Sequence, residues 1–386
     1  MRWSLALVRA LAVMALRISE DSGVFPDDFC SCLQRDLCQS LPADHQFQVE
    51  PHTMVQLTAL FLYQVMMFDK EGADWKQYDW SKVTTVTMEY LDTDLVCHAH
   101  ANKARVVMKD LIQRNYLTDS RRRANWIAFI VDYSKLLYLD GINLDLQSTT
   151  SNYSALPQAL REVTNMFHKK IPGSQVTFNV PWTPDCPNGQ CHDYVEMANS
   201  CDFLVVKSYN LQNQMWDECF AKAGAPYHQV YSGLSAYIKL GVDSRKLVMA
   251  ISWYGYDYPC QRFYEPGRCE LKKIPVGGAP CSSKAGRSIP YKVIMQQLPR
   301  SITGRYWDDD YKSPYFVYRV NNTYHEVWYD DPESISLKSS ILKKLKLRGI
   351  GAATGNALNY TGYPAAAMQT EEMWNALCPI RGKWRT

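Results

Sequence analysis

The chain has 386 residues, a length that suits two or three domains, or one barrel of roughly 250 to 300 residues with an insertion. Hydrophobic residues make up 46% and charged residues 21%, close to globular averages, which excludes a disordered, collagenous or coiled-coil chain. The net charge is only +3, so the charge balance gives no basis for nucleic-acid binding.

Residues 1–20 have the pattern of a secretory signal peptide. Arg2 and Arg9 flank an apolar run that is too short to span a bilayer, which takes about 20 residues. The start of a buried helix is the alternative. No later run is apolar enough for a membrane helix, although 54–67 (MVQLTALFLYQVMM) comes closest. We therefore expect a protein of the secretory pathway, lysosomal or extracellular, without a membrane span.

The twelve cysteines also favour an oxidising compartment. Their number is even, and the short spacings of Cys186 with Cys191 and of Cys260 with Cys269 suit disulfide-closed loops. No metal is expected, because paired C-x-x-C elements are lacking and few histidines lie nearby. Glycosylation is predicted at three N-x-[ST] sequons, Asn152, Asn321 and Asn359.

Apolar, β-branched runs recur along the chain, with helical apolar spacing between them, as in 154–170 and 336–347. Continuous apolar strands that alternate with helices are typical of parallel βαβ units. Eight such strands predict an α/β fold, a (β/α)8 TIM barrel. The predicted strands are 65–68, 83–90, 104–110, 141–147, 176–182, 203–209, 246–253 and 349–354.

The stretch 256–333 breaks this rhythm with three cysteines, Gly/Pro clusters and hairpin-like Tyr/Val runs. It predicts a small β-rich (α+β) insertion after the seventh strand, so that the barrel comprises 21–255 and 334–386. Upstream, 51–64 is either a genuine insertion or a wrongly joined coding segment. If it displaced the first strand, the barrel would stay open at an exposed edge.

The predicted fourth strand carries an unusual polar row in the sequence D-G-I-N-L-D-L-Q (140–147). Alternate side chains of a strand share a face, so Asn143, Asp145 and Gln147 point the same way. In a barrel this row lines the interior, with Gln147 toward the carboxyl end, where barrel enzymes place their chemistry. A structural hydrogen-bond ladder is the alternative, because buried polar side chains need partners.

Long motifs elsewhere match one family in the same order. They are C-S-C…C at 30–38, YDW at 78–80, DGINLD at 140–145, GSQVTFNVPW at 173–182, WYGYDY at 253–258, GGAPCS at 277–282, VWYDDPESISLK at 327–338 and RGIG at 348–351. On these residues the chain resembles glycoside hydrolase family 18, and in particular its chitobiose-cleaving members. The resemblance runs from about Cys30 to the C-terminus.

The resemblance implies a substrate-assisted retaining mechanism, an exception to two-carboxylate glycosidase chemistry. In that mechanism the N-acetyl oxygen of the sugar attacks the anomeric carbon. A glutamic acid at the end of a D-G-x-x-x-D-x-E signature protonates the leaving oxygen. Asp145 matches the aspartate that orients the acetamido group, and Tyr209 matches a tyrosine that hydrogen-bonds the acetamido carbonyl.

The acid position of that signature is Gln147 here. An amide cannot donate a proton to a leaving group, and general acid catalysis is typically worth about 10²–10⁴-fold. Glu89, Asp110 and Asp185 are other carboxylates near predicted strand ends, and we interpret them as solvated loop side chains. Asp140 is expected to support the backbone of the fourth strand rather than to act as an acid.

Three further departures fall on the same predicted pocket. Asn210 stands where the family usually has an aspartate, and Lys207 replaces a methionine and needs an anion such as Asp145 or Asp140. Ala353 replaces the tryptophan of the eighth strand that normally forms the floor under the cleaved sugar. Loss of such a stacking ring costs on the order of 1–3 kcal/mol of binding.

These features predict a secreted or lysosomal, catalytically impaired family 18 protein, a monomer without cofactor, that binds N-acetylglucosamine oligosaccharides. Trp182, Trp253 and Tyr209 could supply the aromatic platforms, with ordinary core aromatics as the alternative. The alternative function is active hydrolysis of the chitobiose cores of glycoprotein-derived oligosaccharides by the substrate-assisted route. A structural or protein-interaction role is the third possibility.

Overall fold

The computed structural model describes residues 30, 32–42, 64–69, 72–146, 154–185, 192–211, 218–264, 267–275 and 280–377. Eight strands form a closed barrel in the order β1-β15-β7-β6-β5-β4-β3-β2, which confirms the predicted fold class. The barrel strands are β1 (Gln64–Asp69), β2 (Thr85–Met88), β3 (Arg105–Ile112), β4 (Gly141–Leu146), β5 (Gln175–Val180), β6 (Phe203–Lys207), β7 (Leu247–Ser252) and β15 (Gly349–Ala353).

The first strand is in place despite the unusual segment before it. β1 pairs in parallel with β15, with Gln64 opposite Gly349 and Phe68 opposite Ala353. The predicted risk of an open barrel edge is therefore not realised. Residues 43–63 lie outside the described residues, and they hold all of the possible insertion 51–64 except Gln64, which is the first residue of β1. The predicted signal peptide, Asn152, Cys186 and Cys191 also lie outside them.

Helices alternate with the barrel strands as predicted. They are α2 (Thr93–Ala101), α3 (Arg114–Thr118), α4 (Ser120–Leu136), α5 (Leu156–Lys170), α6 (Tyr194–Ser200), α7 (Tyr227–Leu240), α8 (Tyr291–Gln297), α9 (Pro332–Leu345) and α10 (Pro364–Ala376). Short 3₁₀ turns are η1 (Arg35–Leu37), η2 (Asp74–Gln77), η5 (Ser244–Lys246), η6 (Ser283–Ala285), η7 (Leu298–Arg300) and η8 (Gly355–Ala357). No helix in the described ranges combines the length and apolar character that a membrane span needs.

The chain divides into two compact units. The first comprises Met1–Leu62, Asp69–Phe178 and Asn199–Asp202, and the second comprises Tyr63–Phe68, Asn179–Ala198 and Phe203–Thr386.

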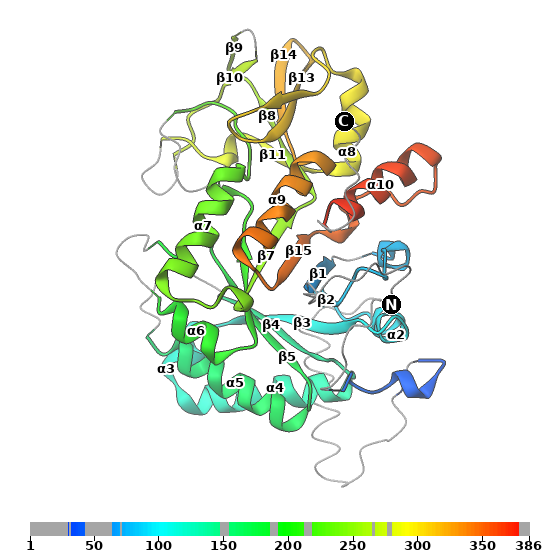
Figure 1. Ribbon diagram of the computed structural model, residues 1–386, viewed down its shortest axis with the longest axis vertical. Helices are drawn as coiled ribbons and strands as arrows, with labels where there is room; N and C mark the ends of the chain where they lie inside the picture. Colours follow the sequence, from blue (N-terminus) through cyan, green and yellow to red (C-terminus); the bar gives the residue numbers. More distant parts are fainter. Residues whose placement is uncertain are drawn as a thin grey trace. The chain divides into compact units, whose positions relative to one another are not determined.

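In the first unit, β2, β3 and β4 pair in parallel register and α4 lies beside α5 (Figure 1). Asp119 caps α4 by accepting hydrogen bonds from the backbone N–H groups of Arg121 and Arg122. Two disulfides, Cys30–Cys38 and Cys32–Cys97, tie the N-terminal segment 30–42 to itself and to α2. This segment is thus covalently part of the first unit.

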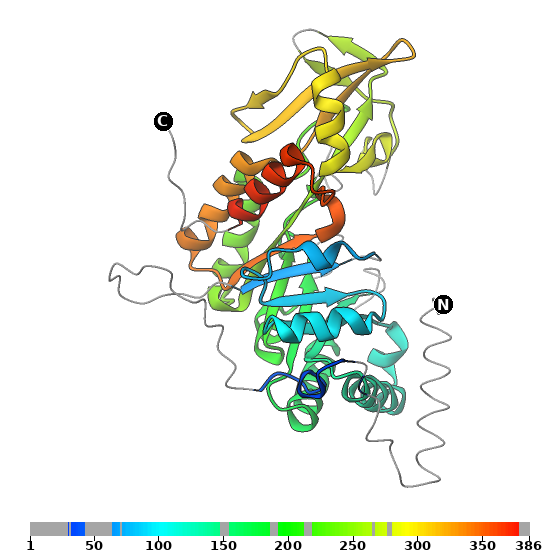
Figure 2. The ribbon, with the colours of Figure 1, turned by 90° about the vertical axis from the view of Figure 1, so that its right-hand side faces the viewer.

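In the second unit, β6, β7, β15 and β1 enclose an apolar core of Met66, Phe203, Val205, Val248 and Ala250. Helix α9 packs against α7 and β15 (Figure 1), and Figure 2 shows it beside α10. Helix α9 begins four residues earlier than the pattern 336–347 predicts. Asp331 is the reason, because its side chain and that of Ser334 form a reciprocal capping box.

A β-rich insertion follows β7 in the second unit, as predicted. Its antiparallel sheet has the order β11-β8-β14-β13-β12, and a separate hairpin pairs β9 with β10. The strands are β8 (Tyr254–Pro259), β9 (Arg262–Tyr264), β10 (Arg268–Glu270), β11 (Arg287–Pro290), β12 (Tyr306–Asp308), β13 (Ser313–Val320) and β14 (Thr323–Trp328). The predicted disulfide Cys260–Cys269 is present, together with Cys219–Cys281.

Candidate functional site

The polar row of the fourth strand lies on β4, in the first unit. Asn143 is fully buried and donates a hydrogen bond from Nδ2 to Thr177 Oγ1 on β5 at 2.7 Å, so at this position the hydrogen-bond ladder is observed. Asp145 is half-buried, and its Oδ1 accepts from the Leu146 backbone N–H. Gln147 follows the last residue of β4 directly and lies outside the described residues.

Asp140, directly before β4, binds backbone groups of neighbouring segments rather than of the fourth strand itself. Its Oδ1 accepts from the Leu41 N–H at 2.6 Å, and its Oδ2 accepts from the Val106 N–H at 2.7 Å and contacts His100 Nε2 at 2.8 Å. Both oxygens are thereby engaged within the first unit. Asp145 remains the predicted anion for Lys207.

The other candidate acids have protein partners. Asp110 is buried and accepts from Trp126 Nε1, so its interpretation as a solvated loop carboxylate is wrong. Glu89 pairs with Lys109 at 2.6 Å. Asp185 is exposed and accepts from the Thr183 hydroxyl. Each of these carboxylates is thus engaged by a neighbouring side chain of the protein.

Lys207 is the last residue of β6 and Tyr209 lies two residues further along, so both continue the alternate positions whose side chains face the core. Phe203 and Val205 belong to the apolar core of the second unit, and Tyr209 packs against the same core. Because side chains alternate along a strand, Lys207 shares their face. Both Lys207 and Tyr209 are half-buried, in agreement with positions near the carboxyl end of a barrel strand.

The predicted aromatic platforms differ in exposure. Trp182 is half-buried and packs against Gly233 of α7, where a methyl group would lie 2.2 Å from the Trp182 carbonyl oxygen. Trp253 is fully buried, and its backbone N–H donates to the Ala353 carbonyl. Ala353 is buried at the end of β15, opposite Ser252. Within the second unit, therefore, Trp182 and Tyr209 keep partly accessible rings.

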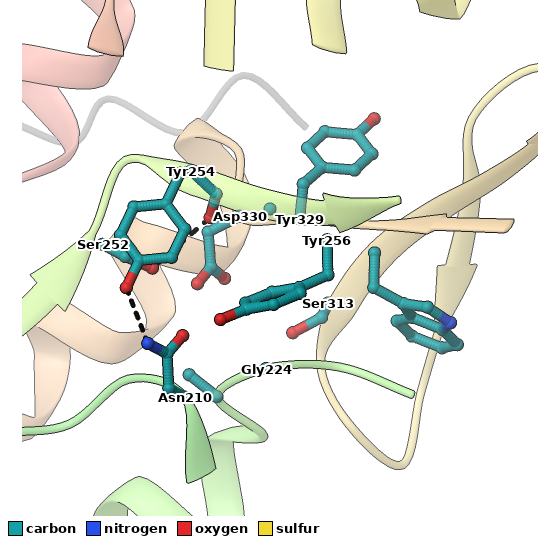
Figure 3. A pocket seen from close by; sticks show the side chains of 11 residues that line it. Asn210, Gly224, Ser252, Tyr254, Tyr256, Ser313, Tyr329 and Asp330 are labelled. Carbon is teal, nitrogen blue, oxygen red and sulfur yellow. Dashed lines mark hydrogen bonds between the residues drawn. The ribbon is translucent and has the colours of Figure 1, made fainter. Parts of the chain in front are cut away.

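A pocket lies within the second unit, beyond the carboxyl ends of β6 and β7 (Figure 3). Four aromatic side chains and several hydroxyl, amide and carboxylate groups meet there. Such a mixture is typical of sites that bind polar organic ligands. The lining residues are Asn210, Gly224, Ala225, Ser252, Tyr254, Gly255, Tyr256, Ser313, Trp328, Tyr329 and Asp330.

Asn210 is the predicted site residue that reaches this pocket. Its backbone is left-handed (φ +57°), a conformation that asparagine tolerates better than most residues. Its Nδ2 donates to the Tyr254 hydroxyl oxygen at 2.9 Å. Burial, with the nearby Tyr209 and Tyr256, raises the pKa of Tyr254, and the Asn210 hydrogen bond opposes this. The Tyr254 hydroxyl thus stays protonated, and its hydrogen is left for another acceptor.

Trp328 lines the pocket, and contacts with Glu326 and Tyr315 fix its indole ring. Its Nε1–H donates to Glu326 Oε1 at 2.6 Å, and its ring stacks on Tyr315 with centroids 4.5 Å apart. Burial raises the pKa of Glu326 to about 8, while the Trp328 hydrogen bond lowers it. The indole is therefore fixed by a buried carboxyl group that is mostly protonated below that pH.

Sequence reasoning missed Tyr256, Ser313 and Asp330. A signal for the tyrosine exists in W-Y-G-Y-D-Y, because Tyr254 and Tyr256 alternate on β8 and share a face. For Ser313 and Asp330, no local pattern indicates a pocket, since β13 and β14 meet β8 only through the folded insertion.

Comparisons with known proteins agree with the fold and the motifs. The family model of glycosyl hydrolases family 18 matches residues 113–352. Human di-N-acetylchitobiase is 42% identical over 356 residues, which cover 91% of this chain and 88% of that protein. Di-N-acetylchitobiase of Mus musculus is also 42% identical, over 91% of this chain and 93% of its own length.

Solved chitinase structures share the fold. A class V chitinase from Nicotiana tobaccum superposes with a TM-score of 0.63 at 16% identity, covering 81% of this chain and 98% of that one. The C-terminal domain of a putative chitinase from Desulfitobacterium hafniense gives 0.64 at 16% identity, covering 82% and 98%. From the family model and the 42% identical relatives together, this chain belongs to glycosyl hydrolase family 18.

Proposed function

We propose that this protein is a chitobiase-like member of family 18 that binds N-acetylglucosamine oligosaccharides and hydrolyses them poorly. The observation that carries the proposal is Gln147, at the acid position of the signature, directly after the end of β4 at Leu146. An amide there can hold a glycosidic oxygen by a hydrogen bond but cannot protonate it. Loss of the acid lowers turnover without removing the residues that contact the sugar.

Binding is supported by groups that remain. Asp145 and Tyr209 match the family residues that orient and hydrogen-bond the acetamido group, and both are partly accessible. Lys207 and Ala353 alter the predicted inner subsite, and Ala353 removes the stacking floor. We therefore expect weaker binding at that subsite than at the aromatic pocket around Tyr254 and Tyr256.

The proposed compartment is lysosomal or extracellular. The four disulfides among the described cysteines support it, because such bonds persist in oxidising compartments. Asn321 is exposed in the turn between β13 and β14, so its side chain is accessible for glycosylation. Asn359 is half-buried, and its Oδ1 accepts from the N–H and hydroxyl of Thr361 of the same sequon.

The second candidate function is active di-N-acetylchitobiase. It is favoured by the 42% identity to relatives of that name over 91% of the chain. This activity would need a proton donor other than Gln147. Glu89, Asp110 and Asp185 are the candidates that the sequence offers, and each already has a protein partner.

Hydrolysis of a chromogenic chitobioside by the purified full chain separates the two functions. We expect Gln147→Glu to raise turnover about 10²-fold or more over wild type, and Gln261→Glu, an exposed site, to leave it unchanged. If the glutamate alone does not restore turnover, adding Ala353→Trp tests the missing floor. Wild-type turnover equal to that of Gln147→Glu would contradict the impaired assignment.

A further inference from the structure

Asp330 presents a buried carboxylate to the aromatic pocket. It is the second residue after the end of β14 and is 8% exposed. Its Oδ1 accepts from the Ser334 hydroxyl at 2.7 Å and from the Lys338 ammonium group. No described residue donates to Oδ2. Figure 3 shows the carboxylate directed toward the same space as Asn210 and the hydroxyl of Tyr256.

The start of α9 places both partners of Asp330. Ser334 and Lys338 lie four positions apart on this helix, so they share one face. Asp331 and Ser334 form the capping box that fixes the first turn, which sets the helix against the end of β14. Lys338 has no exposed surface, so its charge is neutralised inside the protein by Asp330.

Such a pair is costly as a purely structural element. Burying two charges carries a desolvation penalty that well-packed apolar side chains of similar size avoid. Oδ2 of Asp330 has no donor among the described residues and is not one of the fully buried unpartnered atoms, so its remaining exposed surface lies at the pocket that Asp330 lines. A ligand that donates a hydrogen bond to Oδ2 would give this oxygen the partner that the protein does not supply.

The rest of the pocket indicates which ligand fits. Tyr254, Tyr256, Trp328 and Tyr329 offer aromatic surface, and the Tyr254 hydroxyl keeps a hydrogen to donate. None of the described residues that line it carries a positive charge, and Asp330 would repel an anion. A neutral ring with hydroxyl groups meets these conditions, because its apolar faces contact aromatics while its hydroxyls both donate and accept.

We propose that Asp330 is a hydroxyl-binding residue for the glycan, and that Lys338 and Ser334 are its positioning residues. This inference rests on the proposed function and deepens it by naming the acceptor that selects a free sugar hydroxyl. A site built to hydrogen-bond a hydroxyl discriminates strongly against analogues that lack it. The pocket therefore prefers sugars with an unmodified hydroxyl at the Asp330 contact over their O-methylated forms.

Calorimetric titration of the full chain with N,N′-diacetylchitobiose tests the assignment. Asp330→Ala alone would leave the Lys338 charge buried and unpaired, so the informative variant is the double substitution Asp330→Ala with Lys338→Met. We expect it to keep the wild-type melting temperature within a few degrees and to lose about 10- to 100-fold in affinity. Asp310→Asn, an exposed carboxylate of the same insertion, serves as the control and should bind like wild type.

The positioning role has its own readout. With Lys338→Met alone, we expect a lower affinity for chitobiose and a weaker preference over its O-methylated derivatives, which a packing role alone would not change. Wild-type affinity and selectivity in the double variant would overturn the role of Asp330 while leaving the proposed function intact. Failure of the wild-type protein to bind chitobiose would overturn the proposed function and this inference together.

Discussion

The indole rings of Trp253 and Trp374 meet edge to face, with centroids 5.0 Å apart. Trp253 stands directly after β7, and Trp374 belongs to α10, so the pair joins the C-terminal helix to the barrel part of the second unit. Both side chains are almost completely buried. The ring that the sequence suggests as a sugar platform is thus a packing element in this structure.

This contact predicts that Trp253→Ala acts on stability. Removing a buried tryptophan leaves a cavity and typically costs about 3–5 kcal/mol of the free energy of unfolding. Urea unfolding should show this loss, whereas Trp307→Ala, at a half-exposed ring, should cost far less. Unchanged stability in Trp253→Ala together with lost chitobiose binding would instead support the platform role.

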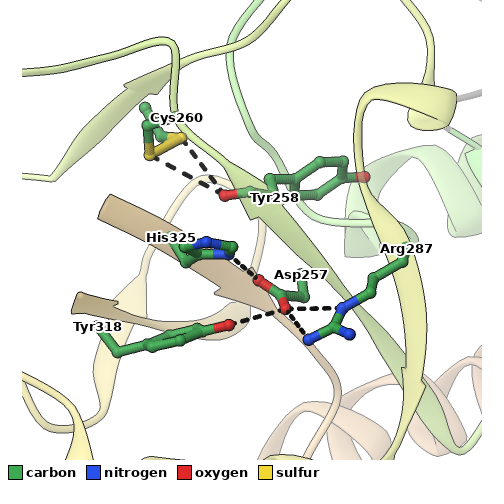
Figure 4. A network of polar contacts seen from close by, with 7 residues as sticks. Asp257, Tyr258, Cys260, Arg287, Tyr318 and His325 are labelled. Atoms are coloured by element: carbon green, nitrogen blue, oxygen red, sulfur yellow. Dashed lines mark hydrogen bonds and ion pairs between the residues drawn. A yellow bond between two sulfur atoms is a disulfide. The ribbon is translucent and has the colours of Figure 1, made fainter. Parts of the chain in front are cut away.

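Asp257 predicts a second stability effect, in the insertion. Its fully buried carboxylate accepts from His325 Nδ1 at 2.8 Å, from the Tyr318 hydroxyl at 2.8 Å and from Arg287 Nε and Nη2 (Figure 4). These partners lie on β14, β13 and β11, so one side chain on β8 links four strands. Asp257→Ala leaves several donors unsatisfied, so we expect a loss of at least about 2 kcal/mol.

Thermal unfolding of Asp257→Ala measures that loss. Asp243→Ala is the matched control, because Asp243 and its partner Arg245 are exposed and such pairs contribute about 0–1 kcal/mol. Equal melting temperatures for the two variants would show that the four-strand network contributes no more than a surface ion pair.

The barrel could be predicted from the sequence because each strand carries its own signal. The run that forms β7 is apolar up to its last residue, Ser252, and is fully buried, and β4 is marked by its polar alternation. The three-residue strands β9 and β10 have no such signal, since they are too short to show a period. Strand ends also shifted, as in β2, which spans only Thr85–Met88.

The candidate site was predictable only where a family motif marks a residue. Asn210 follows β6 at a known position, and the structure places it in the pocket. Asp330 and Lys338 lie in one motif too, but the motif does not show that the two side chains pair, because the contact depends on the start of α9 at Pro332. The pair of His100 with Asp140 joins residues 40 positions apart, and no local pattern encodes it.

His100 predicts a pH dependence of the first unit. Its Nδ1 lies 2.8 Å from the Leu37 carbonyl oxygen and its Nε2 lies 2.8 Å from Asp140 Oδ2. Both partners accept hydrogen bonds, and a neutral imidazole has one N–H, so the protonated ring alone satisfies both. Burial lowers the pKa of His100, but the hydrogen bond and charge of Asp140 and the Leu37 carbonyl together raise it above its usual value.

A raised pKa in the folded state stabilises the protein below the unfolded pKa of about 6.5, and this contribution is lost as the pH rises through the folded value. Arg105 also acts on Asp140: burial lowers the pKa of Arg105, and the charges of Asp140 and Asp202 partly oppose this. The melting temperature should fall from pH 5 to pH 8, and His100→Gln should flatten that fall. His98→Gln, on the same helix, should not flatten the fall but make it slightly steeper, because burial and the charge of Lys76 lower the pKa of His98, and a lowered pKa favours the folded state as the pH rises.

Glu326 predicts a separate pH effect, in the second unit. Burial raises its pKa to about 8, so between about pH 4.5 and 8 the unfolded chain is ionised at this residue while the folded chain holds the proton. Stability therefore falls as the pH rises through this window, by up to about 5 kcal/mol. Glu326→Gln removes the ionisation and retains an oxygen that accepts from Trp328 Nε1.

The variant should thus melt at a higher temperature than wild type at pH 7.5 and at nearly the same temperature at pH 4.5. The double variant His100→Gln with Glu326→Gln tests whether the two groups act independently. Because the residues lie in different compact units, the changes in melting temperature of the two single variants should add in the double variant. If Glu326→Gln lowers the melting temperature equally at both pH values, the carboxyl group acts through its hydrogen bond to Trp328 and not through its ionisation.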